Sequence, residues 1–325
     1  MPYNAPMLLN VGMLIAGGVL LWFGAGWIVD SASAIARKFK VSELIIGLTI
    51  VAMGTSAPEF LVTLMAAFKG LPDLSLANVA GSNIFNLGII LGIMALIRPI
   101  PTHKTILFRD GLILLAVHAI TLAMVWNLFL GRVDGAILVA IFLLYLGYLL
   151  FRARQVPDPS GDPELSAFAA DVPDQREAVW WDYPRLLGGF VAIAGGSELL
   201  VDGATAIALT LGVSSWIIGL TVVAAGTSLP EMVTCIAASL KAKNDLLLGS
   251  LLGSDFFNFA GVLGITCLLR PLVVSPAALP GMIALVGFMV LVLIFIRSGW
   301  RIGRLEGGIL ITLGLARWGM NYWFH

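Results

Sequence analysis

Two segments of this chain have nearly the same sequence. Residues 45–60 read IIGLTIVAMGTSAPEF and residues 217–232 read IIGLTVVAAGTSLPEM, so 12 of 16 positions are identical at a spacing of 172 residues. Each copy places one glutamate, Glu59 or Glu231, directly after a proline in an otherwise apolar segment. The chain is therefore a unit used twice, and each copy carries a carboxylate where burying one is costly.

The 172-residue spacing extends well beyond this pair of segments. It relates GSNIFN at residues 81–86 to GSDFFN at residues 253–258. It also relates single positions along the chain: Asp30 to Asp202, Lys69 to Lys241, Arg98-Pro99 to Arg270-Pro271, and Gly131-Arg132 to Gly303-Arg304. These matches need no insertion or deletion. Each residue of the first copy therefore has a defined counterpart 172 positions further along.

The composition is that of an integral membrane protein. Apolar residues make up 59% of the chain and charged residues 12%, with a mean hydropathy of +0.98. Soluble domains are roughly 45–50% apolar and about 25% charged. The apolar runs are long enough for helices that cross a bilayer, and they lack the alternation of barrel strands. The sequence therefore predicts an all-α integral membrane protein, and its net charge of zero argues against a nucleic-acid partner.

We expect ten transmembrane helices, over residues 8–29, 43–68, 74–97, 106–127, 133–152, 185–208, 214–240, 246–269, 279–297 and 304–323. The orientation follows from lysine and arginine, which collect in cytoplasmic loops. With the N-terminus outside, 15 of these residues lie on the inner side and 4 on the outer side. The prediction is a multi-pass protein of the cytoplasmic (inner) membrane with both termini outside.

An odd number of spans in each copy turns the second copy upside down. Residues 1–151 and 185–325 would then form two inverted five-helix repeats, joined by a polar, proline-containing cytoplasmic linker over residues 152–184. Inverted repeats recur in secondary transporters, whose binding sites lie near the midplane where the repeats meet. The plainer alternative is a duplication without alternating access.

Each glutamate motif predicts a break in its helix. Pro58 has no backbone N–H, so the carbonyl of Gly54 loses its helical partner and the helix bends. Thr55 and Ser56 lie one turn before Glu59, on the same face. The second copy repeats this arrangement with Gly226, Thr227, Ser228, Pro230 and Glu231. Hydroxyls, freed carbonyls and a carboxylate therefore gather at each break.

The second motif adds two polar pairs, each four residues apart on one helix face: Ser82 with Asn86, and Ser254 with Asn258. Oxygen ligands with negative charge suit hard cations such as Ca²⁺ and Na⁺, and two carboxylates would neutralise one Ca²⁺. Small polar residues in membrane helices also bond their own backbone or pack against neighbours, which is the plainer reading of Ser82 or Ser254 alone. Intramembrane carboxylates such as Glu59 and Glu231 instead mark functional sites.

The paired motifs GTSAPE and GTSLPE, followed by GSNIFN and GSDFFN, resemble the alpha-repeats of the Ca²⁺/cation antiporter superfamily. The nearest resemblance is to prokaryotic Na⁺/Ca²⁺ exchangers, including their K⁺-dependent-like members, and it covers essentially the whole chain. It implies the five-plus-five inverted fold and exchange of Ca²⁺ for Na⁺ by alternating access. It also implies a set of cation ligands: Glu59, Glu231, Thr55, Ser56, Thr227, Ser228, the carbonyls of Ala52 and Ala224, and Ser82, Asn86, Ser254 and Asn258.

The chain departs from the family pattern at one position. Asn258 stands where many members carry an aspartate, which leaves the coupling ion, any K⁺ requirement and the stoichiometry open. Asp255, one turn earlier, either places a charge near the site or bonds a loop. Three other acids leave two alternatives open: Asp30 and Asp202, near helix ends, and Glu198, whose counterpart is Gly26. They are either helix-end or helix–helix polar contacts or parts of a gate or cation vestibule.

We therefore expect a secondary active antiporter that exchanges Ca²⁺ for Na⁺. H⁺/Ca²⁺ exchange is the alternative within the same superfamily, and an intramembrane hydrolase or a channel would belong to other classes. No histidine, lysine or metal-ligand partner lies near Ser56 or Glu59 to activate a nucleophile, and a channel does not need a two-state inverted repeat. The expectation is no enzymatic activity, no cofactor and no obligate protein partner, with K⁺ or H⁺ as further candidate ions beside Ca²⁺ and Na⁺.

Overall fold

The computed structural model describes residues 7–153, 177–211 and 224–323, which are almost entirely helical. The elements in chain order are α1 Met7–Lys38, α2 Glu43–Ile46, η1 Gly47–Val51, α3 Ala52–Thr55, α4 Ala57–Phe68, α5 Pro72–Ile84, η2 Phe85–Ile90, α6 Leu91–Ile97, β1 Ile100–Pro101, η3 Ile106–Gly111, α7 Leu112–Val125, β2 Phe129–Leu130, α8 Arg132–Ala153, α10 Asp182–Thr210, α12 Ala224–Gly226, α13 Leu229–Leu240, α14 Asn244–Phe256, η6 Phe257–Leu263, α15 Gly264–Leu269, β3 Leu272–Val273, η7 Pro276–Ala278, α16 Leu279–Gly299, β4 Arg301–Ile302 and α17 Arg304–Trp323.

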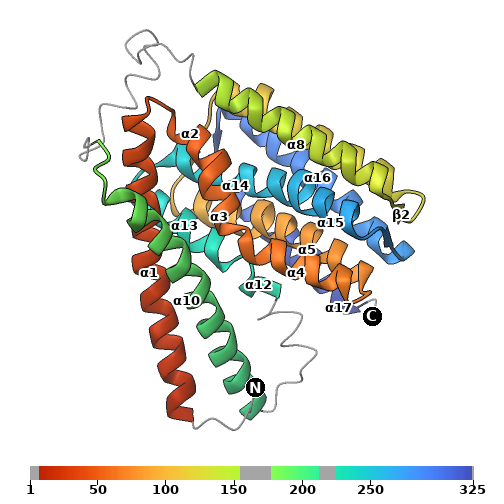
Figure 1. Cartoon of the computed structure of the whole chain (residues 1–325), viewed down its shortest axis with the longest axis horizontal. Coiled ribbons are helices and arrows are strands. Elements are labelled where there is room, and N and C mark those ends of the chain that lie inside the picture. The colour runs from red at the N-terminus through yellow and green to blue at the C-terminus, as the bar shows by residue number, and fades with distance from the viewer. Residues whose placement is uncertain (1–6, 154–176, 212–223, 324–325) are drawn as a thin grey trace.

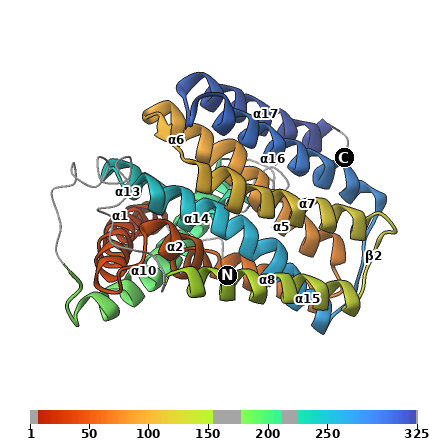
Figure 2. The same cartoon turned by 90° about the horizontal axis from the view of Figure 1, so that it is seen from above.

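The helices form two groups. α1 and α10 lie side by side at one edge of the molecule, and the other described helices pack into a larger bundle (Figure 1). Seen from above, α14 runs through the middle of this bundle, with α8 on one side and α6 and α17 on the other (Figure 2). The apolar stretch of the continuous helix 244–269 is completely buried inside the protein. This enclosed helix carries the second-copy motif GSDFFN.

The described helices fit a multi-pass membrane protein. Seven of them are long and apolar enough to cross a bilayer, and the bent pair Glu43–Thr55 and Ala57–Phe68 would make an eighth. α1 continues to Lys38, although the sequence predicted an end near residue 29. Residues 31–36 are serine and alanine except for Ile35, and all six are buried. Their hydropathy therefore does not mark them as part of the span.

The predicted helix breaks occur at the two glutamate motifs. α3 ends at Thr55 and the chain resumes as α4 with a bend of 49°. Ser56, between them, has φ −85° and ψ 10°, and Ser228, between α12 and α13, has φ −93° and ψ 6°. The bend at the first motif confirms the effect expected of Pro58. The helix that carries the second glutamate motif was predicted over residues 214–240, and its residues 214–223 lie outside the described residues.

Two short β-ribbons join the copies in a reciprocal way. In one ribbon Ile100 pairs with Ile302, and in the other Leu130 pairs with Leu272. Position 100 plus 172 is 272, and position 130 plus 172 is 302, so the two pairings are counterparts of each other. The contacts between copies thus repeat with the same spacing as the sequence.

α1 and α10 cross at very short range because glycines face each other. A Cβ atom added to Gly17 would lie 2.7 Å from the Gly196 carbonyl oxygen, and one added to Gly24 would lie 3.0 Å from the Gly189 carbonyl oxygen. These contacts are also counterparts, since Gly17 corresponds to Gly189 and Gly24 to Gly196. Close approach of small residues is a main source of helix association in membranes. The two helices therefore form one tightly packed unit, called here the α1–α10 pair.

We predict that Gly17→Val lowers the midpoint of thermal unfolding in detergent. The free energy of unfolding should fall by about 1–3 kcal/mol, the usual cost of overpacking. The added side chain would meet the backbone of α10, which cannot move aside as a flexible side chain would. Gly18→Val is the matched control, because nothing lies within 4 Å of a Cβ at Gly18. Equal midpoints of thermal unfolding in the two variants would contradict a tight crossing at Gly17.

Candidate cation site

Glu59 and Glu231 are buried together inside the helix bundle. Both are completely inaccessible to solvent, and they lie close enough for their charges to interact. Each occupies the first turn of the helix that follows its break, Glu59 in α4 and Glu231 in α13. The positive end of the helix dipole favours a carboxylate at such a position. The proline-induced break therefore creates a helix N-terminus inside the bundle, where it can stabilise a buried negative charge.

Each copy supplies a hydroxyl to the carboxylate of the other copy. The Ser56 hydroxyl donates a hydrogen bond to Glu231 Oε1 at 2.7 Å. The Ser228 hydroxyl donates to Glu59 Oε1 at 3.1 Å. These two bonds are counterparts across the 172-residue spacing. The sequence placed Ser56 beside Glu59 in its own helix, but the structure shows that the serine crosses to the opposite glutamate.

The second motif extends this cluster through Ser254 and Asn86. Ser254 Oγ lies 2.6 Å from Ser56 Oγ and 3.1 Å from Glu231 Oε1. Asn86 Nδ2 donates to Ser254 Oγ at 3.4 Å. Hydroxyl, amide and carboxylate groups from both copies are therefore continuous within hydrogen-bond distance. The structure brings together these four predicted residues in one place.

A layer of amide contacts lies next to the cluster. Asn86 Nδ2 donates to Asp255 Oδ1 at 2.9 Å, and its counterpart Asn258 Nδ2 donates to Asn83 Oδ1 at 3.1 Å. Asn83 Nδ2 also donates to the Asp255 carbonyl at 3.0 Å. Asp255 is fully buried, so it does not serve a loop. Asn83 was missed as a site residue, and its only signal in the sequence was its correspondence to Asp255.

Other predicted residues serve their own helices or stand apart. The Thr55 hydroxyl donates to the Val51 carbonyl at 3.1 Å and the Ala52 carbonyl at 3.3 Å, which is the plainer reading of a membrane threonine. The Ala52 carbonyl also accepts the backbone N–H of Ser56. Ser82 is buried but makes none of the described hydrogen bonds of the cluster. In the second copy Thr227 is partly buried near Glu59, and Ala224 begins α12.

The cluster contains many buried oxygens that lack a hydrogen-bond partner. Among the described residues, five carboxylate or amide oxygens are of this kind: Glu59 Oε2, Glu231 Oε2, Asn86 Oδ1, Asp255 Oδ2 and Asn258 Oδ1. All five belong to this cluster and its amide layer. Buried acceptors without partners are costly, and a hard cation with oxygen ligands would satisfy them. The donor set therefore fits Ca²⁺ or Na⁺.

The acids alone would not complete a metal site. The described part of the chain contains no group of three or more His, Cys, Asp or Glu side chains positioned to share one metal ion. Glu59 and Glu231 would need serine hydroxyls, amide oxygens or carbonyls as further ligands. This mixed set is typical of sites for hard cations, in which charged ligands are few and neutral oxygens complete the shell.

The helix containing Asn86 and the helix containing Asn258 both widen at these residues. η2 begins at Phe85 and η6 begins at Phe257, and both are π-helical turns inside longer α-helices. Such turns occur often at functional sites because they displace one residue from the regular backbone pattern. The two turns are counterparts. Nothing in the hydropathy pattern marked them.

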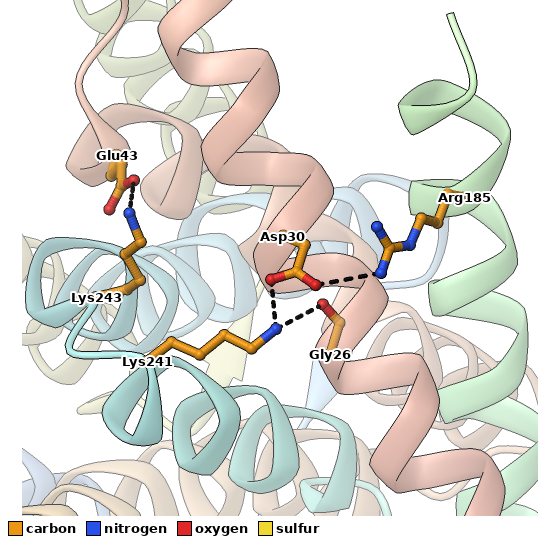
Figure 3. Close-up of polar contacts among 6 residues, drawn as sticks. All are labelled: Gly26, Asp30, Glu43, Arg185, Lys241 and Lys243. Atoms are coloured by element: carbon orange, nitrogen blue, oxygen red, sulfur yellow. Dashed lines mark hydrogen bonds and ion pairs between the residues drawn. The ribbon is translucent and has the colours of Figure 1, made fainter. Parts of the chain in front are cut away.

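The acids near the helix ends lie outside this cluster and differ from each other. Asp30 is bound by Arg185 and Lys241, so it joins α1 to α10 and to the end of α13 (Figure 3). Its counterpart Asp202 and the neighbouring Glu198 are exposed on α10, and neither forms an ion pair within the described residues. Asp30 therefore makes a polar contact between helices, which was one of the two alternatives for these acids.

Comparison with known proteins identifies the family of this chain. The sodium/calcium exchanger protein family matches residues 9–151 and 183–315. The putative antiporter CaxA of Alkalimonas amylolytica is 36% identical over 309 residues, which cover 94% of this chain and 96% of CaxA. The sodium/calcium exchanger MaX1 of Methanosarcina acetivorans is 32% identical over 345 residues, which cover 94% of this chain and 97% of MaX1.

A solved structure shares the whole fold. The sodium-calcium exchanger NCX_Mj superposes on this chain with a TM-score of 0.82 at 30% sequence identity, covering 96% of this chain and 98% of that one. The chain therefore belongs to the sodium/calcium exchanger family, as its motifs indicated. It is a membrane transporter and not an enzyme.

We predict that Ca²⁺ raises the midpoint of thermal unfolding of the protein in detergent. A ligand that binds only the folded state stabilises it by about 2.7 kcal/mol at one hundred times its Kd. Glu231→Gln removes one carboxylate from the cluster and should abolish most of the shift. Glu306→Gln, at the start of α17 and away from the cluster, should keep it. A full Ca²⁺ shift in Glu231→Gln would remove this glutamate from the cation site.

Proposed function

We propose that this protein is a secondary active antiporter that exchanges Ca²⁺ for Na⁺ across the cytoplasmic membrane. The observation that carries the proposal is the reciprocal pair of bonds, Ser56 to Glu231 and Ser228 to Glu59, beside five unpartnered carboxylate and amide oxygens. A single Ca²⁺ would be neutralised by the two glutamates. The names of the relatives MaX1 and NCX_Mj support the same pair of ions.

The charge of the cluster makes exchange obligatory in this proposal. After Ca²⁺ leaves, two carboxylates at close range in a medium of low dielectric would repel each other strongly. Other cations must enter before the site can turn to the other side. Hydroxyls of Ser56, Ser228 and Ser254 beside the carboxylates offer neutral oxygen ligands for Na⁺, which a site coupled only to protons would not require.

The proposal includes the architecture expected from the sequence. Ten spans form two inverted five-helix repeats over residues 1–151 and 185–325, joined by a cytoplasmic linker at 152–184, with both termini outside. The reciprocal β-ribbons, glycine crossings and serine–glutamate bonds support a pseudo-twofold relation. The relation would place the cation site where the repeats meet, as in other transporters with inverted repeats.

Asp255 joins the cation-binding machinery in this proposal. Its Oδ1 accepts from Asn86, its Oδ2 is buried without a partner, and Ser254 beside it contacts Glu231. Asn258 is uncharged where many family members carry an aspartate, and Asp255 would supply a third negative charge beside Glu59 and Glu231. This charge would help to bind a second cation next to the one held by the glutamates. Asp255→Asn should reduce Na⁺-dependent protection against thermal unfolding, while Asp245→Asn, a partly exposed acid at the start of α14, should not. Unchanged protection by Na⁺ in Asp255→Asn would exclude this role.

The test of the function is Ca²⁺ uptake into proteoliposomes at fixed pH with a Na⁺ gradient as the only driving force. We expect a Na⁺ gradient to drive Ca²⁺ in the opposite direction, and Glu59→Gln to lose nearly all flux while still eluting as folded protein. The loss follows from removing one of two charges that neutralise the ion. Uptake that ignores Na⁺ but responds to a pH step would instead establish H⁺/Ca²⁺ exchange.

A further inference from the structure

The α1–α10 pair is not placed symmetrically on the rest of the protein. α1 packs closely along α13, whereas its counterpart α10 makes no comparable contact with α4, the counterpart of α13. The crossing between α1 and α10 is itself symmetric, as the glycine contacts show. The asymmetry therefore lies in how the pair as a whole is docked. It is docked at the end where α13 terminates and does not pack closely on α4 at the opposite end.

An ion pair joins the two groups of helices at the docked end. Asp30 of α1 is bound by Lys241, the residue that caps α13, and the Lys241 ammonium also donates to the Gly26 carbonyl at 3.4 Å (Figure 3). Arg185 binds the other oxygen of Asp30 at 3.2 Å. Arg185 belongs to α10, so it stays with Asp30 when the pair moves. Only Lys241 ties Asp30 to the bundle within the described part of the chain.

The counterparts of these residues lie at the undocked end and are apart. Asp202 corresponds to Asp30, and Lys69, which caps α4, corresponds to Lys241. Both side chains are exposed, and within the described residues neither takes part in an ion pair. Gly26, whose carbonyl contacts Lys241, corresponds to Glu198, which lies one turn from Asp202 on α10. Lys69 would therefore meet two carboxylates if α10 docked on α4.

We propose that Asp30–Lys241 and Asp202–Lys69 are alternative latches, one for each orientation of the cation site. In the described conformation Asp30–Lys241 is closed and Asp202–Lys69 is open. In the other conformation the α1–α10 pair docks on α4, Lys69 binds Asp202 and Glu198, and Lys241 releases Asp30. The inference rests on the proposed alternating access, and it adds the four residues that set the balance between the two conformations.

The latches are unequal, which gives the transporter a preferred state. At the docked end Arg37 of α1 also lies 3.5 Å from Glu43 of the bundle, and Lys243 binds the same glutamate at 2.8 Å (Figure 3 shows the latter contact). The counterparts of Arg37 and Glu43 in the sequence are Leu209 and Ser215, which carry no charge. The second ion pair therefore has no counterpart for the other conformation, and it favours the conformation described here.

These contacts bias the equilibrium without locking it. Asp30 and Lys241 are both partly exposed, so their attraction is screened by water and salt. Loss of one such pair should change the ratio of two conformations about two- to fivefold. A bias of this size lets the site alternate while holding each end closed for part of the cycle.

The test measures the two conformations directly and does not depend on transport. Spin labels at Leu71→Cys and Leu211→Cys, both exposed and near the undocked end, report the approach of α10 to α4 by pulsed electron resonance. The native cysteines are replaced in a Cys235→Ala/Cys267→Ala background, so that only the two introduced cysteines carry labels. The label positions leave Lys69 and Asp202 unchanged. Lys241→Gln should raise the ratio of short to long label distances about two- to fivefold, and Lys69→Gln should lower it by a similar factor. Arg270→Gln, an exposed cation without an ion pair within the described residues, is the matched control.

The two variants must act in opposite directions. The double variant Lys69→Gln/Lys241→Gln should return close to the parent ratio. Shifts in the same direction, or no shift in either variant, would overturn the latch. If Na⁺-driven Ca²⁺ flux is absent but the ratios move as expected, the proposed function fails and the latch stands. If flux is intact and the ratios do not move, the latch alone fails.

Discussion

The structure depends on keeping two carboxylates, Glu59 and Glu231, buried inside a bundle of apolar helices. A charge taken out of water is expensive unless fixed dipoles, hydrogen bonds or an opposite charge replace the solvent. The chain supplies the first two by breaking a helix in front of each glutamate. The break provides a helix N-terminus, and Ser56 and Ser228 provide hydroxyls. In the proposed function the remaining oxygens bind a cation, whose positive charge offsets the cost of burying the carboxylates.

Duplication explains why these parts fit together. Ser56 serves Glu231 and Ser228 serves Glu59, so neither copy is complete without the other. The same reciprocity recurs in the β-ribbons and in the glycine crossing of α1 and α10. A symmetric centre with an asymmetrically docked α1–α10 pair is expected of a protein with two mutually exclusive conformations. Sequence symmetry and structural asymmetry together support the proposed switch between two orientations of one site.

Much of this could be predicted from the sequence, because its signals are local. A proline next to an acid in an apolar run marked Glu59 and the bend before it, and apolar length marked the helical ranges. Contacts between distant segments could not be predicted. The crossing of Ser56 to the opposite glutamate, the role of Asn83, and the partners of Asp30 all depend on how helices far apart in the chain are placed. The end of α1 was missed for a related reason, since residues 31–36 are covered by protein and not by lipid.

The central claim is that Na⁺ and Ca²⁺ compete for one buried site held by Glu59 and Glu231. Equilibrium binding of radioactive Ca²⁺ to the purified protein, at rising Na⁺ and constant ionic strength, tests it most directly. The account predicts that Na⁺ raises the apparent Kd for Ca²⁺ more steeply than in proportion to its concentration, with the number of bound Ca²⁺ at saturation unchanged. Na⁺ that leaves the apparent Kd unaltered, or that lowers only the saturating amount, would contradict a shared site.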